Sequence, residues 1–368
     1  MLTGINVLDL SRVLAGPLCT MMLGDMGARV IKVERPGSGD ETRGWGPPFD
    51  DRGESAYYLS VNRNKKSVAI DFDDDAGRDL LLRLIAGADV VVENFRPGTL
   101  QRRGIDAAEM LVVHPSLIWC TITGFGEASD RAGYDLVVQA ESGWMAITGE
   151  PLGSPMRVGV ALADIVAGKD AAIAVLGALV ARHAASGGAN TGAKARHLYI
   201  SLLASATAAL INVAQNSLVS GADARRWGNQ HPNLVPYQLF DAEDRPLIIA
   251  VGSDAQWKAC ALALGLGALA ADEALATNEG RLASREQVVA AVATRIRERT
   301  AAEWVERLNG VGVPCGVVRS VLDALRKVDA SPLTGIAPSV PGSVRLPPPR
   351  LDEHGDVIRR SSWDVFAE

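Results

Sequence analysis

The sequence predicts an α/β protein in which a larger domain is built on a parallel sheet and a smaller domain is α+β. Three observations carry this prediction. Strand-like and helix-like segments alternate through the first third of the chain. The 368 residues are more than one hydrophobic core usually serves, so two domains are expected. The character of the sequence changes after Gly221, where a second compact unit begins.

Short apolar runs bounded by Gly, Pro and polar residues predict the strands of the larger domain. Amphipathic or Ala-, Leu- and Met-rich segments between them predict the connecting helices. Strands are expected at residues 5–10, 29–34, 67–72, 89–93 and 117–123, and helices at 18–26 and 76–85. Strands joined by crossover helices run parallel, so we expect a Rossmann-like sheet with helices on its faces.

Longer helices are predicted next, at residues 164–185 and 198–219. A polar, aromatic link at 225–230 then leads into the smaller domain, which we place at 221–325. It begins with a hairpin-like pattern and continues with three helices, at residues 237–251, 255–264, 285–298 and 301–308.

Composition bounds the function. Formal net charge is −6, with 37 Lys and Arg against 43 Asp and Glu, so nucleic acid is not an expected partner. The four cysteines are far apart and form no CxxC pair, which disfavours a zinc site or a disulfide framework. No signal-peptide pattern and no run of eighteen apolar residues is present, so we expect a cytoplasmic protein without membrane contact.

The loops that follow the predicted strands hold basic residues but no dinucleotide fingerprint. The first loop reads SRVLAGPL and lacks GxGxxG, which argues against NAD or FAD. Basic residues near strand ends could surround an anionic ligand, or could form an ordinary solvated face. These residues are Arg35, Lys65, Lys66, Arg96, Arg102 and Arg103.

Asp164 has two interpretations. It stands among small and apolar residues where the helix at 164–185 is predicted to begin, so it could be the helix N-cap. Ala167 occupies the position at which a capping box would place Glu or Gln. Alternatively, a helix N-terminus would keep the carboxylate ionised for nucleophilic attack.

Taken together, the motifs resemble those of the family III CoA-transferases, which include formyl-CoA transferase and the succinyl-CoA-dependent dicarboxylate CoA-transferases. The matching stretches follow one another in family order over the first 170 residues. They are LDLSRVLAGPLCTMMLGDMGARVIKVERPGSGD, NRNKKSVAID, VVENFRPGTLQRRGI, TGFG, GYDLVVQAESGWMAITGEP and GVALADIVAG.

The resemblance implies a CoA-transferase that needs no cofactor beyond its CoA thioester substrate and in which Asp164 is the nucleophile. It implies that CoA and substrate are bound by Leu14, Ala15, Arg35, Asn94, Phe95, Arg96, one or both of Arg102 and Arg103, Tyr134, and Gly252 in the loop 251–256. Leu14 stands where formyl-CoA transferase has Gln, which disfavours oxalate and formate as substrates. An interlocked homodimer is also implied, with the large domain formed by residues 1–220 and completed by the tail 326–368.

Two alternatives and one specificity hypothesis accompany this interpretation. A racemase of the α-methylacyl-CoA branch would carry His before Asp135, where this chain has Tyr134, and an ordinary phenol is a poor base at pH 7. A non-catalytic CoA-binding protein would keep the basic loops without needing Asp164. The segment 225–238 resembles members that use succinyl-CoA and a small dicarboxylate, and Arg225 or Arg226 could bind the second carboxylate; the alternative is a plain linker.

Overall fold

A computed structural model describes residues 1–185, 196–328 and 336–367. The chain forms two compact units, each considered by itself. The first comprises Met1–Met145, Arg157–Ala224 and Val328–Glu368, and the second Ala146–Met156 and Arg225–Lys327. Compared with the expected ranges, the second unit also takes in a segment from the middle of the chain, Ala146–Met156.

The first unit is built on a six-stranded, entirely parallel sheet in the order β3-β2-β1-β4-β5-β6. From β1 the chain winds outward through β2 and β3, then returns to the other side of β1 for β4, β5 and β6. The α/β class and the parallel sheet are therefore confirmed. The strands are β1 (Asn6–Asp9), β2 (Arg29–Glu34), β3 (Lys65–Ala69), β4 (Val90–Glu93), β5 (Ile118–Thr123) and β6 (His197–Ser201).

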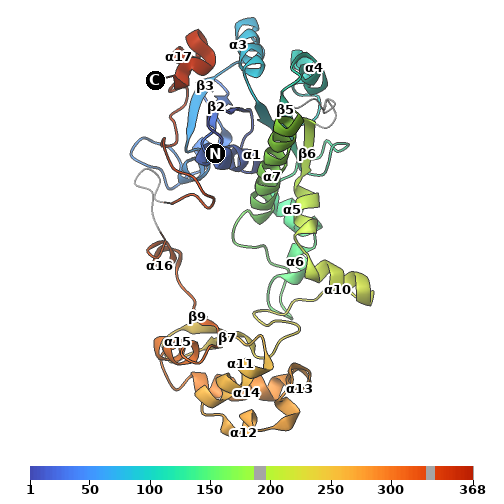
Figure 1. Ribbon diagram of the computed structural model, residues 1–368, viewed down its shortest axis with the longest axis vertical. Helices are drawn as coiled ribbons and strands as arrows, with labels where there is room; N and C mark the ends of the chain where they lie inside the picture. The colour runs from blue at the N-terminus through green and yellow to red at the C-terminus, as the bar shows by residue number, and fades with distance from the viewer. Residues whose placement is uncertain (186–195, 329–335, 368) are drawn as a thin grey trace. The chain divides into compact units, whose positions relative to one another are not determined.

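Helices cover both faces of this sheet. Successive side chains along a strand point to opposite faces, and both faces are apolar, so each must be covered. On β5, for example, Cys120 joins the apolar cluster under α1 (Ala15–Asp25) and α7 (Leu162–Ala185), whereas Trp119 joins the cluster on the other face. Figure 1 shows α7 beside α1 and β6. The first face also holds α5 (Asp135–Glu141) and α9 (Leu202–Ala208), and the second holds α3 (Asp75–Ala86) and α4 (Ala107–Val113).

The prediction of one helix at 198–219 was wrong. The segment forms β6, then α9, then α10 (Asn212–Ser220), with a break at Ile211, whose φ is +43°. Ser201 ends the strand and caps α9 by accepting a bond from the amide of Ala204 at 3.3 Å. The backbone groups of β6 pair with the edge of β5, a long-range interaction that a local pattern does not reveal.

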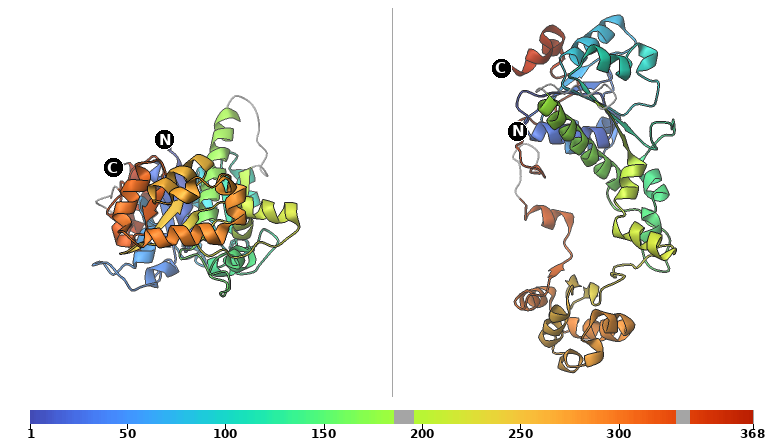
Figure 2. Two further views of the ribbon diagram at one scale, coloured as in Figure 1. Left: turned by 90° about the horizontal axis from the view of Figure 1, so that it is seen from below. Right: turned by 45° about the vertical axis from the view of Figure 1, so that its right-hand side comes forward.

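The C-terminal segment packs back onto the first unit. The indole Nε1 of Trp363 donates to the Leu84 carbonyl at 3.0 Å, and Arg345 donates to the carbonyls of Gly24 and Ala28 at 2.7 and 2.9 Å. Figures 1 and 2 show α17 (Gly355–Ser361, red) alongside β3 and α3 (blue). Residues 329–335 of the expected tail lie outside the described residues.

The second unit is α+β. An antiparallel sheet in the order β7-β8-β9 packs against helices whose buried tryptophans, Trp257 and Trp304, centre its core. Its strands are Tyr237–Asp241, Pro246–Ala250 and Cys315–Val317, and its helices are α11 (Asp254–Ala263), α12 (Gly267–Ala270), α13 (Asn278–Ala283), α14 (Arg285–Ile296), α15 (Ala301–Asn309) and α16 (Val321–Leu325). Two further short α-helices among the described residues are α2 (Ala56–Ser60) and α6 (Trp144–Ile147).

No single helix in the described part of the chain is long and apolar enough to cross a membrane. Taken together, α9 and α10 reach the length and apolar composition of a membrane span, but the two helices are bent by 74° relative to each other.

Candidate active site

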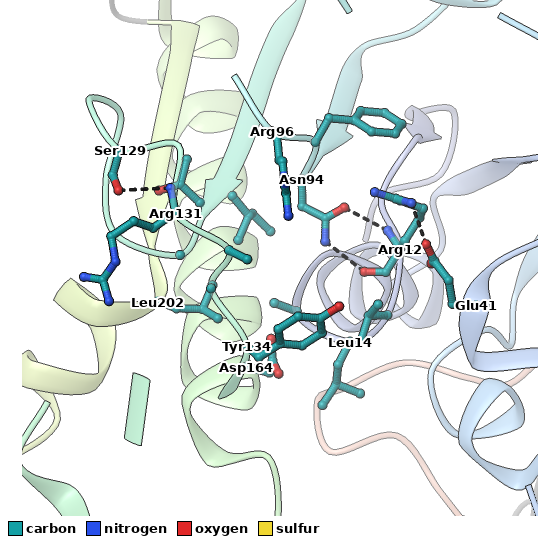
Figure 3. Close-up of a pocket in the computed structure, with 18 of the residues that line it drawn as sticks. Arg12, Leu14, Glu41, Asn94, Arg96, Ser129, Arg131, Tyr134, Asp164 and Leu202 are labelled. Atoms are coloured by element: carbon teal, nitrogen blue, oxygen red, sulfur yellow. Dashed lines mark hydrogen bonds and ion pairs between the residues drawn. The ribbon is translucent and has the colours of Figure 1, made fainter. Parts of the chain in front are cut away.

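A cavity of about 350 Å³ opens at the carboxyl ends of β1 and β4, where the winding of the sheet changes direction. Open α/β sheets bind their ligands at this position. Figure 3 shows side chains from several loops converging on it. Seven of the site residues predicted from the sequence line the cavity together: Leu14, Ala15, Asn94, Phe95, Arg96, Tyr134 and Asp164.

Asn94 ties the loop after β1 to the loop after β4. Its amide accepts from the backbone amide of Arg12 at 2.9 Å and donates to the Arg12 carbonyl at 2.8 Å. The Arg12 guanidinium pairs with Glu41 at 2.6 Å and lies 5.2 Å from the centre of the Phe95 ring. Sequence reasoning missed Arg12, although it follows the first predicted strand and meets the rule that selected Arg35 and Arg96.

A buried set of charges lies beneath this loop. Lys65 bonds to the Asp9 carboxylate at 2.9 Å, and Lys32 bonds to Asp40 and to the Ser11 carbonyl, both at 3.0 Å. Burial opposes ionisation of Asp9, but Lys65 and Lys32 outweigh it and hold its pKa at about 2. Asp40 also accepts from the backbone amide of Val13, at 3.2 and 3.3 Å to its two oxygens. The loop that lines the cavity is thereby fixed from below.

Two basic residues considered for an anionic ligand have structural partners instead. Lys65 is buried at the amino end of β3 and also bonds to Asn62 and to the Pro17 carbonyl. Lys66 donates to the Val365 carbonyl and lies over the Phe366 ring, so it anchors the C-terminal segment. The prediction took both to be loop residues because the start of β3 was placed two residues too late.

Asp164 is not the N-cap of its helix. α7 begins at Leu162, so Asp164 lies in the first turn, and Asp135 takes the capping role. One oxygen of Asp135 accepts from the backbone amides of Ala163 and Asp164, at 2.8 and 3.4 Å. The Asp164 carboxylate is therefore free to face the cavity.

The environment raises the pKa of Asp164 to about 7. Burial is the largest cause and the negative charge of Asp135 the second, while the backbone amide of Ala15 acts in the opposite direction. Ala15 is the first residue of α1, so a helix N-terminus does face Asp164, but it belongs to a different helix from the one expected. The sequence analysis expected a helix N-terminus to keep this carboxylate ionised, but the Ala15 amide does not outweigh burial and the charge of Asp135.

Gly168 permits the contact between α1 and α7 that brings these groups together. A Cβ at this position would lie 2.6 Å from the Ala15 carbonyl oxygen, closer than real contacts allow. Asp164 and Gly168 are one helical turn apart and share a face of α7. The glycine therefore sets how near Asp164 comes to the amino end of α1.

A neighbouring cavity of about 500 Å³ holds two more of the predicted residues, Arg35 and Arg103. It shares Arg12, Glu41 and Phe95 with the first cavity, so the two are adjacent. Arg102 lines neither of them. Gly252 lies in the second unit, where its amide donates to Gln256 at 2.9 Å and Ser253 caps α11.

Comparison with known proteins decides the family. A model of CoA-transferase family III matches residues 2–335. The chain belongs to CoA-transferase family III. It is 40% identical to succinyl-CoA:glutarate CoA-transferase of Mus musculus, over 96% of this chain and 84% of the relative. It is 42% identical to succinate–glutarate CoA-transferase of Agrobacterium fabrum, over 87% and 80%.

The fold agrees with this assignment. The crystal structure of a CAIB/BAIF family protein from Brucella suis superposes with a TM-score of 0.83 at 38% identity, covering 97% of this chain and 98% of that one. The expected family resemblance and CoA-transferase activity are thus confirmed. Within the described residues, no three His, Cys, Asp or Glu side chains gather as metal ligands would.

Gly168→Ala should lower kcat at least about tenfold, because the new methyl group forces α7 away from Ala15 and displaces Asp164. The control is Gly177→Ala on the same helix, where an added Cβ meets nothing within 4 Å. It should keep full activity and gain about 0.5–1 kcal/mol of stability from the better helix former. Equal activities of the two variants in a transfer assay would contradict this account of the glycine.

The pKa of Asp164 predicts a pH dependence. If the ionised carboxyl is the reactive form, kcat/KM should fall about tenfold per pH unit below pH 7. This parameter is the one to measure because it reports ionisation of the free enzyme. Because the folded state binds this proton more tightly than the unfolded state does, Asp164 removes stability as pH rises from about 4 to 7. Asp164→Asn should therefore exceed the wild type in unfolding free energy by at least about 1 kcal/mol at pH 8, and by less at pH 4. A kcat/KM that stays flat down to pH 5 would rule out this role for the ionised form.

Proposed function

We propose that this enzyme transfers CoA from succinyl-CoA to a small dicarboxylic acid through a thioester formed on Asp164. The observation that carries the proposal is a carboxylate that lines the cavity without a cationic partner among the described residues. Glu41 lines the same cavity, but Arg12 neutralises it. A nucleophile must be free to react, and only Asp164 of these two is.

The reaction needs no oxidation or reduction. An oxygen of Asp164 attacks the thioester carbonyl and the C–S bond breaks. CoA leaves the acyl carbon as a thiolate, and a mixed anhydride between the donor acid and Asp164 remains. The thiolate then attacks the aspartyl carbonyl, which releases the donor acid as its carboxylate and leaves an aspartyl–CoA thioester. The acceptor carboxylate repeats these two steps in reverse order. Apolar wall residues (Leu14, Ile122 and Leu202) limit the access of water, which would hydrolyse the anhydride.

CoA would extend across the two adjacent cavities, which share Arg12, Glu41 and Phe95. We place the phosphate-bearing end in the outer cavity, where Arg35 is solvent-exposed at the end of β2 and Arg103 pairs with Asp73 at 2.9 Å. Because Asp73 is well exposed, that ion pair is weak and a phosphate can replace it. The thiol arm would pass Phe95, which both cavities share, and reach Asp164.

The names of the relatives support succinyl-CoA and a dicarboxylate as substrates. Two arginines were considered for binding the second carboxylate of a dicarboxylic acid, and one of them, Arg226, already makes hydrogen bonds within the protein. It donates to the carbonyls of Glu150, Ala146 and Gly153, at 3.1, 3.2 and 2.7 Å, and so holds the segment Ala146–Met156. Arg225 stacks on Trp227, 4.0 Å from the ring centre, and makes no hydrogen bond or ion pair with the described residues, so of the two arginines it remains the candidate for binding the second carboxylate.

We also propose a homodimer. α10 leaves Leu218 and Val219 each 78% exposed, and Ile211 before it is 73% exposed. Ile173 of α7 is 66% exposed. Large apolar side chains left exposed on one short segment, as on residues 211–219, are typical of an interface. A second copy of the chain, as the family resemblance implies, would cover them.

Asp164→Asn should fold and bind CoA but lose transfer by several orders of magnitude, because an amide cannot form the anhydride. Wild-type enzyme incubated with acyl-CoA should carry a CoA adduct on Asp164, detected by mass spectrometry, and the Asn variant should carry none. The amide keeps the size of the side chain and leaves the cap at Asp135 untouched. A variant that keeps a tenth of normal turnover, with deamidation excluded by mass, would refute the mechanism.

Arg35→Ala and Arg103→Ala should each raise the KM for acyl-CoA about ten- to a hundredfold, since a charge-assisted bond is worth about 1.5–3 kcal/mol. Arg102→Ala is the matched control, because this neighbouring arginine lines neither cavity and should leave KM within about twofold. Steady-state kinetics with a varied CoA donor measures all three. An unchanged KM in the Arg35 and Arg103 variants would mean that neither residue binds CoA and that both belong to an ordinary solvated surface.

A further inference from the structure

One face of α5 binds residues 158–164, the segment that ends at Asp164. Asp135 and Gln139 are one helical turn apart and joined by a bond of 2.6 Å from the Gln139 amide to the Asp135 carboxylate. Gln139 is fully buried. It accepts from the backbone amide of Val158 at 2.9 Å and donates to the Val160 carbonyl at 3.2 Å. Together with the cap by Asp135, these bonds fix residues 158–164 to α5.

We propose that Asp135 is a positioning residue for CoA transfer: it holds the first turn of α7 against α5 and places a second negative charge beside the reacting carboxylate of Asp164. This inference rests on the proposed role of Asp164 as nucleophile. Asp135 itself caps backbone amides and does not line the cavity, so it acts through its neighbour.

The cap alone does not explain why the residue is an aspartate. Asn and Ser cap helices about as well as Asp does. The ionised side chain adds repulsion toward Asp164, because two carboxylates in one site disfavour the second charge. A carboxylate that is harder to ionise is also a stronger nucleophile once it has ionised.

The other groups around Asp164 leave this repulsion uncompensated by any cation. From α1, the Ala15 amide favours the ionised form. From α2, Tyr57 is close enough for Asp164 and Asp135 to raise the pKa of its phenol, after burial as the main cause. No ion pair reaches Asp164 from the described residues. The charge of Asp135 is therefore the electrostatic influence on Asp164 that a substitution can remove.

The central experiment compares Asp135→Asn and Asp135→Ser with wild type. The carboxyl ¹³C signal of Asp164, assigned by its loss in Asp164→Asn, is titrated in each protein. Both neutral caps should lower the pKa of Asp164 by at least about one unit. They should also lower kcat at pH 8 about three- to tenfold and change the KM for acyl-CoA less than about twofold. The Ser variant covers a failure of Asn to fold, because the Asn amide would oppose the donor of Gln139.

Two controls separate charge from position. Asp106 also accepts from two amides at a helix N-terminus, but it is the N-cap of its own helix, α4, with bonds of 2.8 and 3.2 Å from the amides of Ala108 and Glu109. It lines neither of the two site cavities. Asp106→Asn should change neither kcat nor the pKa of Asp164. Gln139→Met removes the bonds to Val158 and Val160, and the bond to Asp135 itself, but keeps the charge of Asp135. It should lower kcat while leaving the pKa of Asp164 within about half a unit.

The outcomes are distinct. An unchanged pKa of Asp164 in both Asp135 variants would overturn the electrostatic part of the proposal, and an unchanged kcat as well would overturn all of it. The proposed function fails separately, if Asp164→Asn keeps its activity. In that event the titration still reports whether Asp135 acts on Asp164.

Discussion

The pairing of charges buried beneath the carboxyl end of β1 is the constraint on which the site depends. Asp9, Lys32 and Lys65 have no exposed side-chain surface, so each must be neutralised inside the protein. Removing one partner of such a set typically costs about 3–5 kcal/mol, because it leaves a buried charge unpaired. The same groups, with Asp40, bond to the backbone of Ser11 and Val13. The loop that lines the cavity is thus fixed by the core rather than by a ligand, and its left-handed Val13 (φ +68°) persists for this reason.

Asp164 follows the opposite rule. It is only partly buried, whereas Asp9 and Asp40 are fully buried, and it faces another carboxylate instead of a lysine. Of its neighbours, the Ala15 amide favours its ionised form. Asp9 and Asp164 therefore diverge, with pKa values of about 2 and about 7, although both are removed from much of the solvent. The lysines around Asp9 keep it ionised and bound within the scaffold, whereas the surroundings of Asp164 leave its carboxylate unpaired and reactive. The stabilising scaffold offsets the cost of the reactive site.

Local patterns predicted the parts of this arrangement that are local. Alternating apolar runs located five of the six parallel strands, and the motif order selected seven residues that do meet in one cavity. The failures concern long-range partners. β6 was predicted to be helical because its sequence does not reveal the pairing with β5. Lys65 was considered for an anionic ligand or a solvated face, and neither interpretation could foresee its bond to Asp9, 56 residues away. Asp164 was weighed as a cap for the same reason, since the residue that caps α7 is Asp135, on another helix.

The environment of Asp164 also suits the intermediates of the proposed reaction. Protonation and acylation both turn the carboxylate into an uncharged group. Burial and the charge of Asp135 raise the pKa because they destabilise the ion relative to the acid. The same two causes destabilise the ion relative to the aspartyl–CoA thioester, in which the side-chain carbonyl group of Asp164 is equally uncharged. A site that makes Asp164 reluctant to ionise therefore favours the loaded enzyme, and it shifts the equilibrium of the exchange toward the covalent intermediate without forming any new contact with CoA.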